Sequence, residues 1–119
     1  MQINSGTDME DLTQKKCVAC EGGIPALSKE IIEKKYLPQT KGWQVSEDYK
    51  KISKDYKFKN FMEAISFVNK VGEIAEEENH HPDITFGWGY CKIALYTHAV
   101  KGLTENDFIL AAKINEIKT

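Results

Sequence analysis

The chain contains three histidines, and all three lie between residues 80 and 98. With other residues that could take part in chemistry they form an ordered set: Glu76, His80, His81, Pro82, Trp88, His98 and Asp107. The unperturbed pKa of histidine lies close to neutrality, and neutral imidazole is also a common metal ligand. Three histidines that converge therefore indicate either proton transfer or metal binding.

The first part of this set is expected at the end of a helix. Glu76 and His80 are four residues apart, so we expect them to share one helix face and Glu76 to orient the His80 ring. Pro82 cannot continue a helix and pushes His81 into extended backbone, so the helix must end at the two histidines. His81 then points elsewhere than His80, and the two rings can reach two parts of one ligand.

The second part is expected on a strand and the turn before it. Alternation from Tyr90 to Thr97 predicts a strand, with His98 at its end on the same parity as Trp88 and Tyr90. An aromatic wall beside His98 would make a pocket for a flat, heteroaromatic substrate. Thr97 has the other parity and is expected to face the core, although its hydroxyl adjoins His98 and could also meet the ligand.

Hydrophobic periodicity predicts the elements that position these residues. Ser28 is expected to cap a helix that runs to about Tyr36 and buries Leu27, Ile31 and Ile32. Strands are expected over residues 43–47 and 52–58, joined by a hairpin at 48–50. A helix then runs from about residue 61 to Asn79, and its inward face is expected to comprise Phe61, Ala64, Ile65, Val68, Val71 and Ala75.

Two strands, near 84–86 and 90–97, and a last helix complete the chain. Thr104 is expected to cap that helix, with its inward side chains being Phe108, Ile109, Ala112 and either Ile114 or Ile117. Thr104 and Asp107 also match a capping box, so Asp107 is expected either as a helix cap or as a pocket residue. The order α-β-β-α-β-β-α predicts an α+β fold, a four-stranded antiparallel sheet with helices packed on one face.

Composition narrows the classes of function. The net charge is −2, and all 16 basic residues are lysines, so direct nucleic-acid binding is not expected. The lysines at 50, 51, 54, 57 and 59 are expected on a solvated strand face. Apolar runs are too short for a membrane span or a signal peptide, so a cytoplasmic location is expected.

The N-terminal region is expected to stand apart from this fold. Residues 1–12 are polar and lack periodicity, which predicts a mobile tail. Cys17 and Cys20 form a single CxxC followed by glycines, and Cys91 lies far away. A zinc ribbon needs a second pair, and a thioredoxin-like motif needs a strand before it, so a locally packed, reduced turn is the favoured interpretation.

The ordered set resembles the pattern of the pterin-4a-carbinolamine dehydratases. The family pattern is an acidic residue, three residues, His-His-Pro, five or six residues, an aromatic, nine residues, His and a later Asp. Here the acid is Glu76, the aromatic Trp88, and the gaps are five, nine and eight residues. The resemblance extends from the Ser28 helix to the last helix through three further stretches: Gly42-Trp43, Phe58-Lys59-Asn60-Phe61 and Gly102-Leu103-Thr104.

The resemblance implies a dehydratase domain over 25–119, preceded by a tail and CxxC turn over 1–24. It implies dehydration of 4a-hydroxytetrahydropterin to quinonoid dihydropterin, in pterin recycling after an aromatic amino-acid hydroxylase. It implies that His80 and His98 are the acid/base pair and that His81 anchors the pterin. Glu76 would orient His80. The substrate-binding residues would be Pro82, Trp88, Thr97 and Asp107, with no metal or organic cofactor and with a homodimer or homotetramer as the assembly.

Two other classes stay open at this point. A metal site could use the three histidines with Asp83 or Asp107, although adjacent histidines on extended backbone diverge. A non-catalytic binding or assembly protein could share the fold, but retention of all three histidines favours the enzyme.

Overall fold

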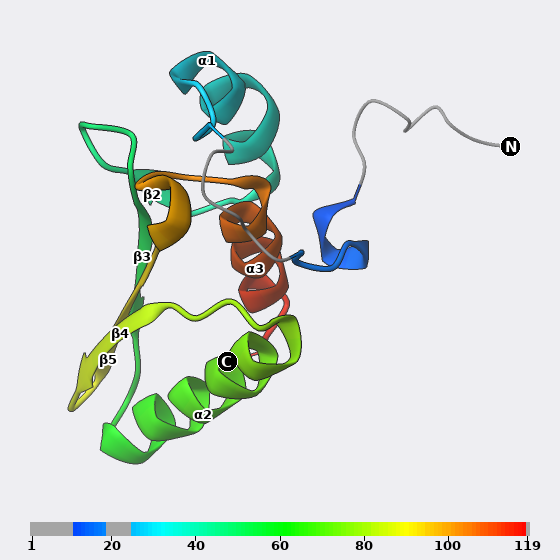
Figure 1. Cartoon of the computed structure of the whole chain (residues 1–119). Coiled ribbons are helices and arrows are strands. Elements are labelled where there is room, and N and C mark those ends of the chain that lie inside the picture. The colour runs from blue at the N-terminus through cyan, green and yellow to red at the C-terminus, as the bar shows by residue number, and fades with distance from the viewer. Residues whose placement is uncertain (1–10, 19–24, 119) are drawn as a thin grey trace, which may run out of the picture.

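Figure 1 shows the computed structural model of the chain, whose described residues are 11–18 and 25–118. The helices are η1 (Leu12–Gln14), α1 (Lys29–Ile31), the π-helical η2 (Ile32–Tyr36), η3 (Leu37–Gln39), α2 (Phe61–Glu78), η4 (His98–Val100) and α3 (Glu105–Asn115). The strands are β2 (Gln44–Val45), β3 (Ile52–Lys57), β4 (Asp83–Gly87) and β5 (Tyr90–Leu95). Their order confirms the predicted α-β-β-α-β-β-α fold.

The four strands form one antiparallel sheet in the order β2-β3-β5-β4. The β4–β5 hairpin pairs Asp83 with Ala94 at its open end and Gly87 with Tyr90 at its turn. The segment that enters β4 therefore lies beside the segment that leaves β5. Because β3 pairs Ile52 with Leu95, the β2–β3 hairpin also reaches the same end of the sheet.

Helix α2 packs on the sheet together with α3, on the same face (Figure 1). Its start is set by Asn60, whose side chain accepts a hydrogen bond from the Glu63 N–H. The buried residues of α2 recur at helical spacing and are Ala64, Phe67, Val71, Ala75 and Glu78. The expectation for Phe61 is wrong: its side chain is exposed and stacks on Phe86, with ring centroids 6.0 Å apart. Ile65 and Val68, also expected inward, are half-buried.

Helix α3 lies at the centre of the packing. Every residue from Asn106 to Ala112 is buried, and so is Ile114. An apolar helix that is covered on all sides belongs to the core and not to a surface layer. Phe108 stacks on Tyr36 of η2 at 4.9 Å, which ties the N-terminal helices to the same core.

The helix at the start of the domain begins as expected but turns a different face inward. The Ser28 side chain accepts a hydrogen bond from the Ile31 N–H. Ile32 is fully buried, Leu27 is half-buried, and Ile31 is 44% exposed, so the expectation of a buried Ile31 is wrong. The chain becomes a π-helix at Ile32 and buries Tyr36 instead.

The predicted mobile tail and the predicted solvated lysine face each need one correction. Leu12 is buried in the core, because η1 packs on α3; the expectation for residues 1–10 lies outside the described residues.

On the predicted solvated lysine face, Lys54 is half-buried, and its Nζ donates to Asn115 Oδ1 at 2.8 Å. Burial lowers the pKa of Lys54. Within the described part of the chain, no helix is long and apolar enough to cross a membrane.

Candidate functional site

The end of α2 fixes the position of His80. Asn79 adopts a left-handed conformation, with φ of 53°, and its N–H bonds to the Ala75 and Glu76 carbonyls. The His80 N–H bonds to the Ala75 carbonyl at 3.2 Å, which completes a Schellman-type helix end. The predicted stop at the histidines is confirmed, and the turn at Asn79 redirects the chain before Pro82 is reached.

His80 forms a hydrogen-bonded pair with Asp107 of α3. The distance from His80 Nε2 to Asp107 Oδ1 is 2.6 Å, and the Asp107 side chain is fully buried while that of His80 is 13% exposed. A carboxylate oxygen can only accept, so Nε2 carries the proton that joins them. The other ring nitrogen, Nδ1, has no hydrogen-bond partner among residues 11–18 and 25–118.

Asp107 is both a helix cap and a pocket residue. Its Oδ2 accepts from the Thr104 N–H at 3.0 Å, which completes the capping box of α3. The same oxygen accepts from Thr97 Oγ1 at 2.8 Å. The two roles that the sequence offered as alternatives coexist, because the two carboxylate oxygens serve different partners. The Thr97 hydroxyl, considered for the ligand, is engaged with Asp107.

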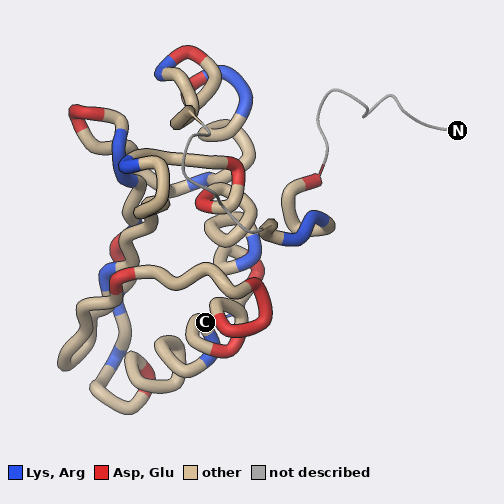
Figure 2. The backbone as a smooth tube through the Cα atoms, viewed as in Figure 1, with Lys and Arg blue, Asp and Glu red and all other residues tan. Residues whose placement is uncertain are grey.

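Glu76 does not orient His80. Its Oε1 lies 2.8 Å from His81 Nε2, and both side chains are exposed, His81 by 55% and Glu76 by 80%. The expectation from four-residue spacing is wrong because the helical backbone ends at Glu78, so the spacing rule no longer applies to His80. Acidic residues gather at this end of α2 (Figure 2).

His98 is the first residue of η4 and not the last residue of the strand, as expected. Strand β5 ends at Leu95, and an isolated bridge between Thr97 and Gly102 closes the turn that carries η4. The His98 side chain lies at the surface, and its ring packs on that of Tyr96 with centroids 4.4 Å apart. An aromatic side chain does adjoin His98, and it is Tyr96.

Trp88 lies at the closed end of the β4–β5 hairpin, and it is 71% exposed. The histidines lie at the open end of the same hairpin, about 20 Å away for a six-residue strand. The expected wall of Trp88 and Tyr90 beside His98 is therefore wrong within one copy of the chain. Strand parity gave the right face of the sheet but says nothing about position along it.

A cavity of about 500 Å³ brings all three histidines together, and we call it the histidine pocket. Its lining residues are Val18, Asn79, His80, His81, Pro82, Asp83, Tyr96, Thr97, His98, Ala99 and Asn106. The predicted site residues Pro82 and Thr97 therefore line it, while Asp107 supports it from behind His80. A cavity of this volume can hold a bicyclic heteroaromatic ring.

Sequence reasoning missed Val18 and Asn106 as lining residues. The Asn106 side chain holds the Val18 backbone at both ends: Nδ2 donates to the Val18 carbonyl at 2.6 Å, and Oδ1 accepts from its N–H at 3.0 Å. Beside it, the Cys17 N–H donates to Glu78 Oε1 at 2.8 Å. The residues that these contacts join are separated by 61 to 88 positions in the sequence, so no local sequence pattern could predict them.

Cys17 is half-buried, and its surroundings disfavour the thiolate. Burial, with a smaller effect from the Glu78 carboxylate, raises the pKa of its thiol to about 12. The interpretation of the CxxC as a locally packed, reduced turn stays a prediction, because its second cysteine, Cys20, lies outside the described residues.

Comparison with known proteins identifies the family. The sequence model of the family described as "Pterin 4 alpha carbinolamine dehydratase" matches residues 25–117. The chain belongs to this family. The resemblance drawn from the histidine pattern is confirmed, and the chain is a pterin-4a-carbinolamine dehydratase of the hydro-lyase class.

Relatives in this dehydratase family match nearly the whole chain. A protein of Rubrobacter xylanophilus, described as "Putative pterin-4-alpha-carbinolamine dehydratase", is 48% identical over 92% of this chain and 100% of its own. A protein of Methylococcus capsulatus with the same description is 48% identical over 92% of this chain and 96% of its own.

Two solved structures share the fold. A protein of Brucella melitensis, described as a transcriptional coactivator/pterin dehydratase, has a TM-score of 0.70 and 30% identity, over 76% of this chain and 95% of its own. A pterin dehydratase-like protein described as a RuBisCO assembly factor in the alpha-carboxysome has a TM-score of 0.54 and 22% identity, over 65% and 89%. At that identity the second likeness shows the fold alone.

The histidine pocket does not gather a set of metal-ligating side chains around one point. In the described ranges, no three His, Cys, Asp or Glu side chains come close enough together to hold one metal ion. His80 turns to the buried Asp107 and His81 turns to the exposed Glu76, so the two adjacent imidazoles diverge.

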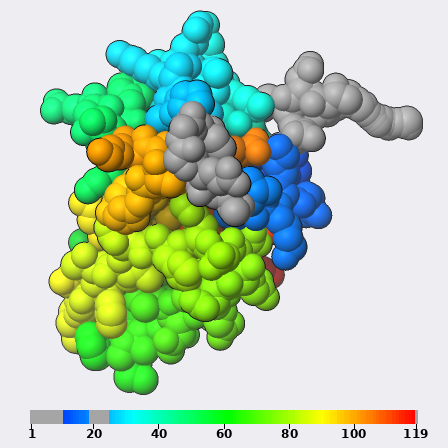
Figure 3. Space-filling model, viewed as in Figure 1, coloured from blue at the N-terminus to red at the C-terminus, as the bar shows by residue number. Residues whose placement is uncertain are grey.

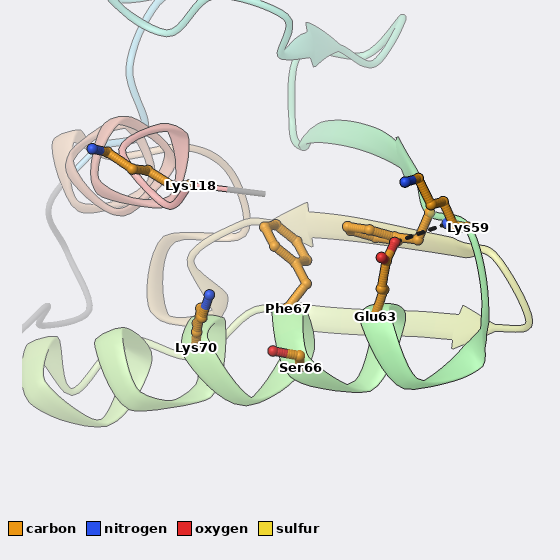
Figure 4. Close-up of a pocket in the computed structure, with 7 residues that line it drawn as sticks. Lys59, Glu63, Ser66, Phe67, Lys70 and Lys118 are labelled. Carbon is orange, nitrogen blue, oxygen red and sulfur yellow. Dashed lines mark hydrogen bonds between the residues drawn. The ribbon is translucent and has the colours of Figure 1, made fainter.

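A separate cavity of about 320 Å³ lies on the N-terminal half of α2 (Figure 4). Its lining residues are Phe58, Lys59, Glu63, Ser66, Phe67, Lys70 and Lys118. The Lys59 N–H donates to Glu63 Oε1 at 3.0 Å, and the aromatic rings form an apolar side. It shares no lining residue with the histidine pocket, so the two cavities are separate.

Proposed function

We propose that the histidine pocket dehydrates 4a-hydroxytetrahydropterin to quinonoid dihydropterin and water by imidazole acid/base catalysis without a metal. The single observation that carries this proposal is the pair of His80 with the buried Asp107. A buried carboxylate that accepts from Nε2 leaves the opposite nitrogen, Nδ1, as the one through which His80 can exchange a proton.

The reaction needs two proton transfers, and the pocket offers two imidazoles on separate elements. The C4a–O bond breaks as an acid protonates the departing hydroxyl, which leaves as water. A ring-nitrogen lone pair forms the new C=N bond, and a base removes a ring N–H proton. His80, at the end of α2, and His98, in η4, would supply the acid and the base. Stereoisomers of the substrate present the hydroxyl on opposite ring faces, so either imidazole can be the acid.

His81 and Glu76 would bind and polarise the pterin ring. His81 lines the pocket, and the side chains of both His81 and its partner Glu76 are exposed. A glutamate partner on His81 Nε2 again directs the second ring nitrogen, Nδ1, toward other partners. This replaces the role predicted for Glu76 on His80.

Metal-free catalysis is supported by the donor geometry and by the chemistry. The two adjacent histidines have separate carboxylate partners, which keeps them from sharing one ion. The leaving group is activated by a lone pair of the substrate itself, so a general acid is sufficient. Loss of activity on chelation, with stoichiometric zinc in the purified protein, would contradict this part of the proposal.

The cellular setting that we propose is pterin recycling in the cytoplasm. The carbinolamine is formed when an aromatic amino-acid hydroxylase consumes tetrahydropterin and oxygen, so such a hydroxylase would supply the substrate. A homodimer or homotetramer is the proposed assembly. Size-exclusion chromatography with light scattering distinguishes these assemblies from a monomer.

A stopped-flow assay of 4a-hydroxytetrahydropterin decay tests the proposal. The uncatalysed decay is the baseline, and the proteins compared are wild type, His81→Ala and the double variant His80→Ala/His98→Ala. We expect wild type to accelerate decay and the double variant to return it to the baseline, with His81→Ala also impaired. Circular dichroism melts establish that each variant is folded. Decay by folded wild type that is no faster than the baseline would overturn the proposed function.

A further inference from the structure

A second hollow, of about 250 Å³, opens beside the histidine pocket. It is lined by the β2–β3 hairpin, the end of β5 and the turn after η4. We call its three cationic residues, Lys50, Lys51 and Lys101, the lysine annex. Figure 3 shows the surfaces of the hairpin and of η4 meeting on one face of the molecule, next to the segment that follows α2.

The annex and the histidine pocket share one wall. Tyr96 and His98 line both hollows. Lys51 Nζ lies 5.1 Å from the centre of the Tyr96 ring, and that ring packs on His98 at 4.4 Å. A cation, an aromatic ring and an imidazole thus follow one another from the annex into the pocket. A ligand that contacts His98 can extend a substituent past Tyr96 to the lysines.

The charge of the annex favours an anion. Three ammonium groups face one carboxylate, Asp48, in a protein whose net charge is −2. That carboxylate is occupied locally: Asp48 Oδ1 accepts from Ser46 Oγ at 2.7 Å and from the Lys50 N–H at 3.0 Å. Over residues 11–18 and 25–118, no ion pair involves any of the three annex lysines.

The turn that carries Lys101 is held in place relative to His80. Lys101 is left-handed, with φ of 54°, and its N–H bonds to the His98 carbonyl at 3.2 Å. The next residue, Gly102, pairs with Thr97, and a Cβ there would meet the Ala26 Cβ at 2.8 Å. Thr97 in turn donates to Asp107, which holds His80. One chain of contacts therefore joins the annex to the acid/base pair.

We propose that this site takes pterins whose side chain ends in an anion, a carboxylate or a phosphate, which the lysine annex binds. This inference rests on the proposed function, because it places the pterin ring in the histidine pocket. Contacts between exposed ammonium groups and an anion are individually weak, so the three together should favour the anionic ligand by roughly tenfold. The preference should shrink at high ionic strength.

The test compares ligands that differ in one charged group. The dissociation constants of 7,8-dihydroneopterin and of its 3′-phosphate are measured by fluorescence at low and at high ionic strength. The proteins are wild type, the annex variant Lys50→Gln/Lys51→Gln/Lys101→Gln and a control, Lys59→Gln/Lys70→Gln/Lys118→Gln. The control removes the same charge from the cavity of Figure 4. The readout is the ratio of the two constants in each protein.

We expect the phosphate to bind roughly tenfold more tightly to wild type and to the control, and the ratio to approach one in the annex variant. 7,8-Dihydrofolate, which carries carboxylates, tests which anion the annex binds. If it binds more tightly than 7,8-dihydroneopterin to wild type, and the annex variant loses that difference, the annex binds carboxylates as well as phosphates. If wild type bound the neutral ligand and both anionic ligands equally, the inference would be overturned and the proposed function would stand. If the control lost the preference for the phosphate as fully as the annex variant, the inference would also be overturned, because the net charge of the protein would then explain the preference. If wild type bound none of these pterins, both the inference and the proposed function would be overturned.

Discussion

The histidine pocket has two walls that are held in different ways. The inner wall, His80 with Asp107 and Thr97, is buried and linked by hydrogen bonds of 2.6 and 2.8 Å. The outer wall, His81 with Glu76, is exposed. A buried imidazole with a fixed partner keeps one tautomer and one orientation, which favours proton transfer. An exposed imidazole can follow the ligand, which suits binding at the rim.

The substitution Asp107→Asn should have the largest effect, because it replaces the carboxylate that accepts the hydrogen bond from His80 in the inner wall. The asparagine oxygen can still cap α3, but its amide would donate to His80 Nε2 and move the ring proton to Nδ1. Nδ1 could then no longer accept a proton, and we expect kcat to fall by about a hundredfold or more.

Stopped-flow decay at neutral pH measures this effect, and a thermal melt separates it from unfolding. If Asp107→Asn retained wild-type kcat, the inner wall would not be the catalytic one.

Glu78 is buried two residues before His80 and ties the end of α2 to Cys17 and Lys113, so Glu78→Gln should lower the stability of the fold in a pH-dependent way. Burial raises the pKa of Glu78, but hydrogen bonds from Lys113 Nζ and the Cys17 N–H outweigh it, so the pKa lies below the ordinary value of 4.5. A depressed folded-state pKa contributes stability that is present above the unfolded value and is lost as the pH falls through the folded value.

We expect Glu78→Gln to lower the free energy of unfolding by about 1–3 kcal/mol at neutral pH. The difference from wild type should shrink as the pH falls below 4.5. Urea unfolding at neutral and acidic pH measures both values. A difference that stays constant across this range would show that the charge of Glu78 does not stabilise the fold.

Glu76→Gln tests the outer wall and should have a small effect. Its pair with His81 is exposed on both sides, and such pairs contribute about 0.2–1 kcal/mol. We expect KM to change by less than about fivefold, with kcat unaltered. A large fall in kcat would give the outer wall the catalytic role that we assign to the inner one.

Trp88→Phe should have the smallest effect. The side chain is 71% exposed at the closed end of the β4–β5 hairpin, away from both walls. We expect wild-type kcat and KM, and stability within about 0.5 kcal/mol. A clear loss of activity in this variant would mean that Trp88 reaches the histidine pocket of a neighbouring copy.

The sequence predicted the fold because its signals are local. Period-two and period-3.6 patterns gave the strands and α2, and Pro82 placed the end of the helix at the histidines. The convergence of the histidines also followed from the pattern. His81 and His98 lie close together because they flank the two strands at the open end of the β4–β5 hairpin.

The partners of these residues could not be predicted in the same way. The left-handed turn at Asn79 breaks the helical spacing, so Glu76 meets His81 and His80 meets a residue of α3. Parity along β5 placed Trp88 beside His98, although the hairpin separates them along the strand. Contacts such as Val18 with Asn106 depend on how distant segments pack, and no periodic signal encodes them.

The place of α3 in the chain has a consequence for biosynthesis. Asp107 follows His80 by 27 residues and Asn106 follows Val18 by 88, yet they hold the His80 ring and the Val18 backbone. Translation runs from the N-terminus at about 5–20 residues per second, so His80 is synthesised before its partner Asp107 exists. Helix α3 must therefore leave the ribosome before the His80–Asp107 pair, and with it the inner wall of the pocket, can form.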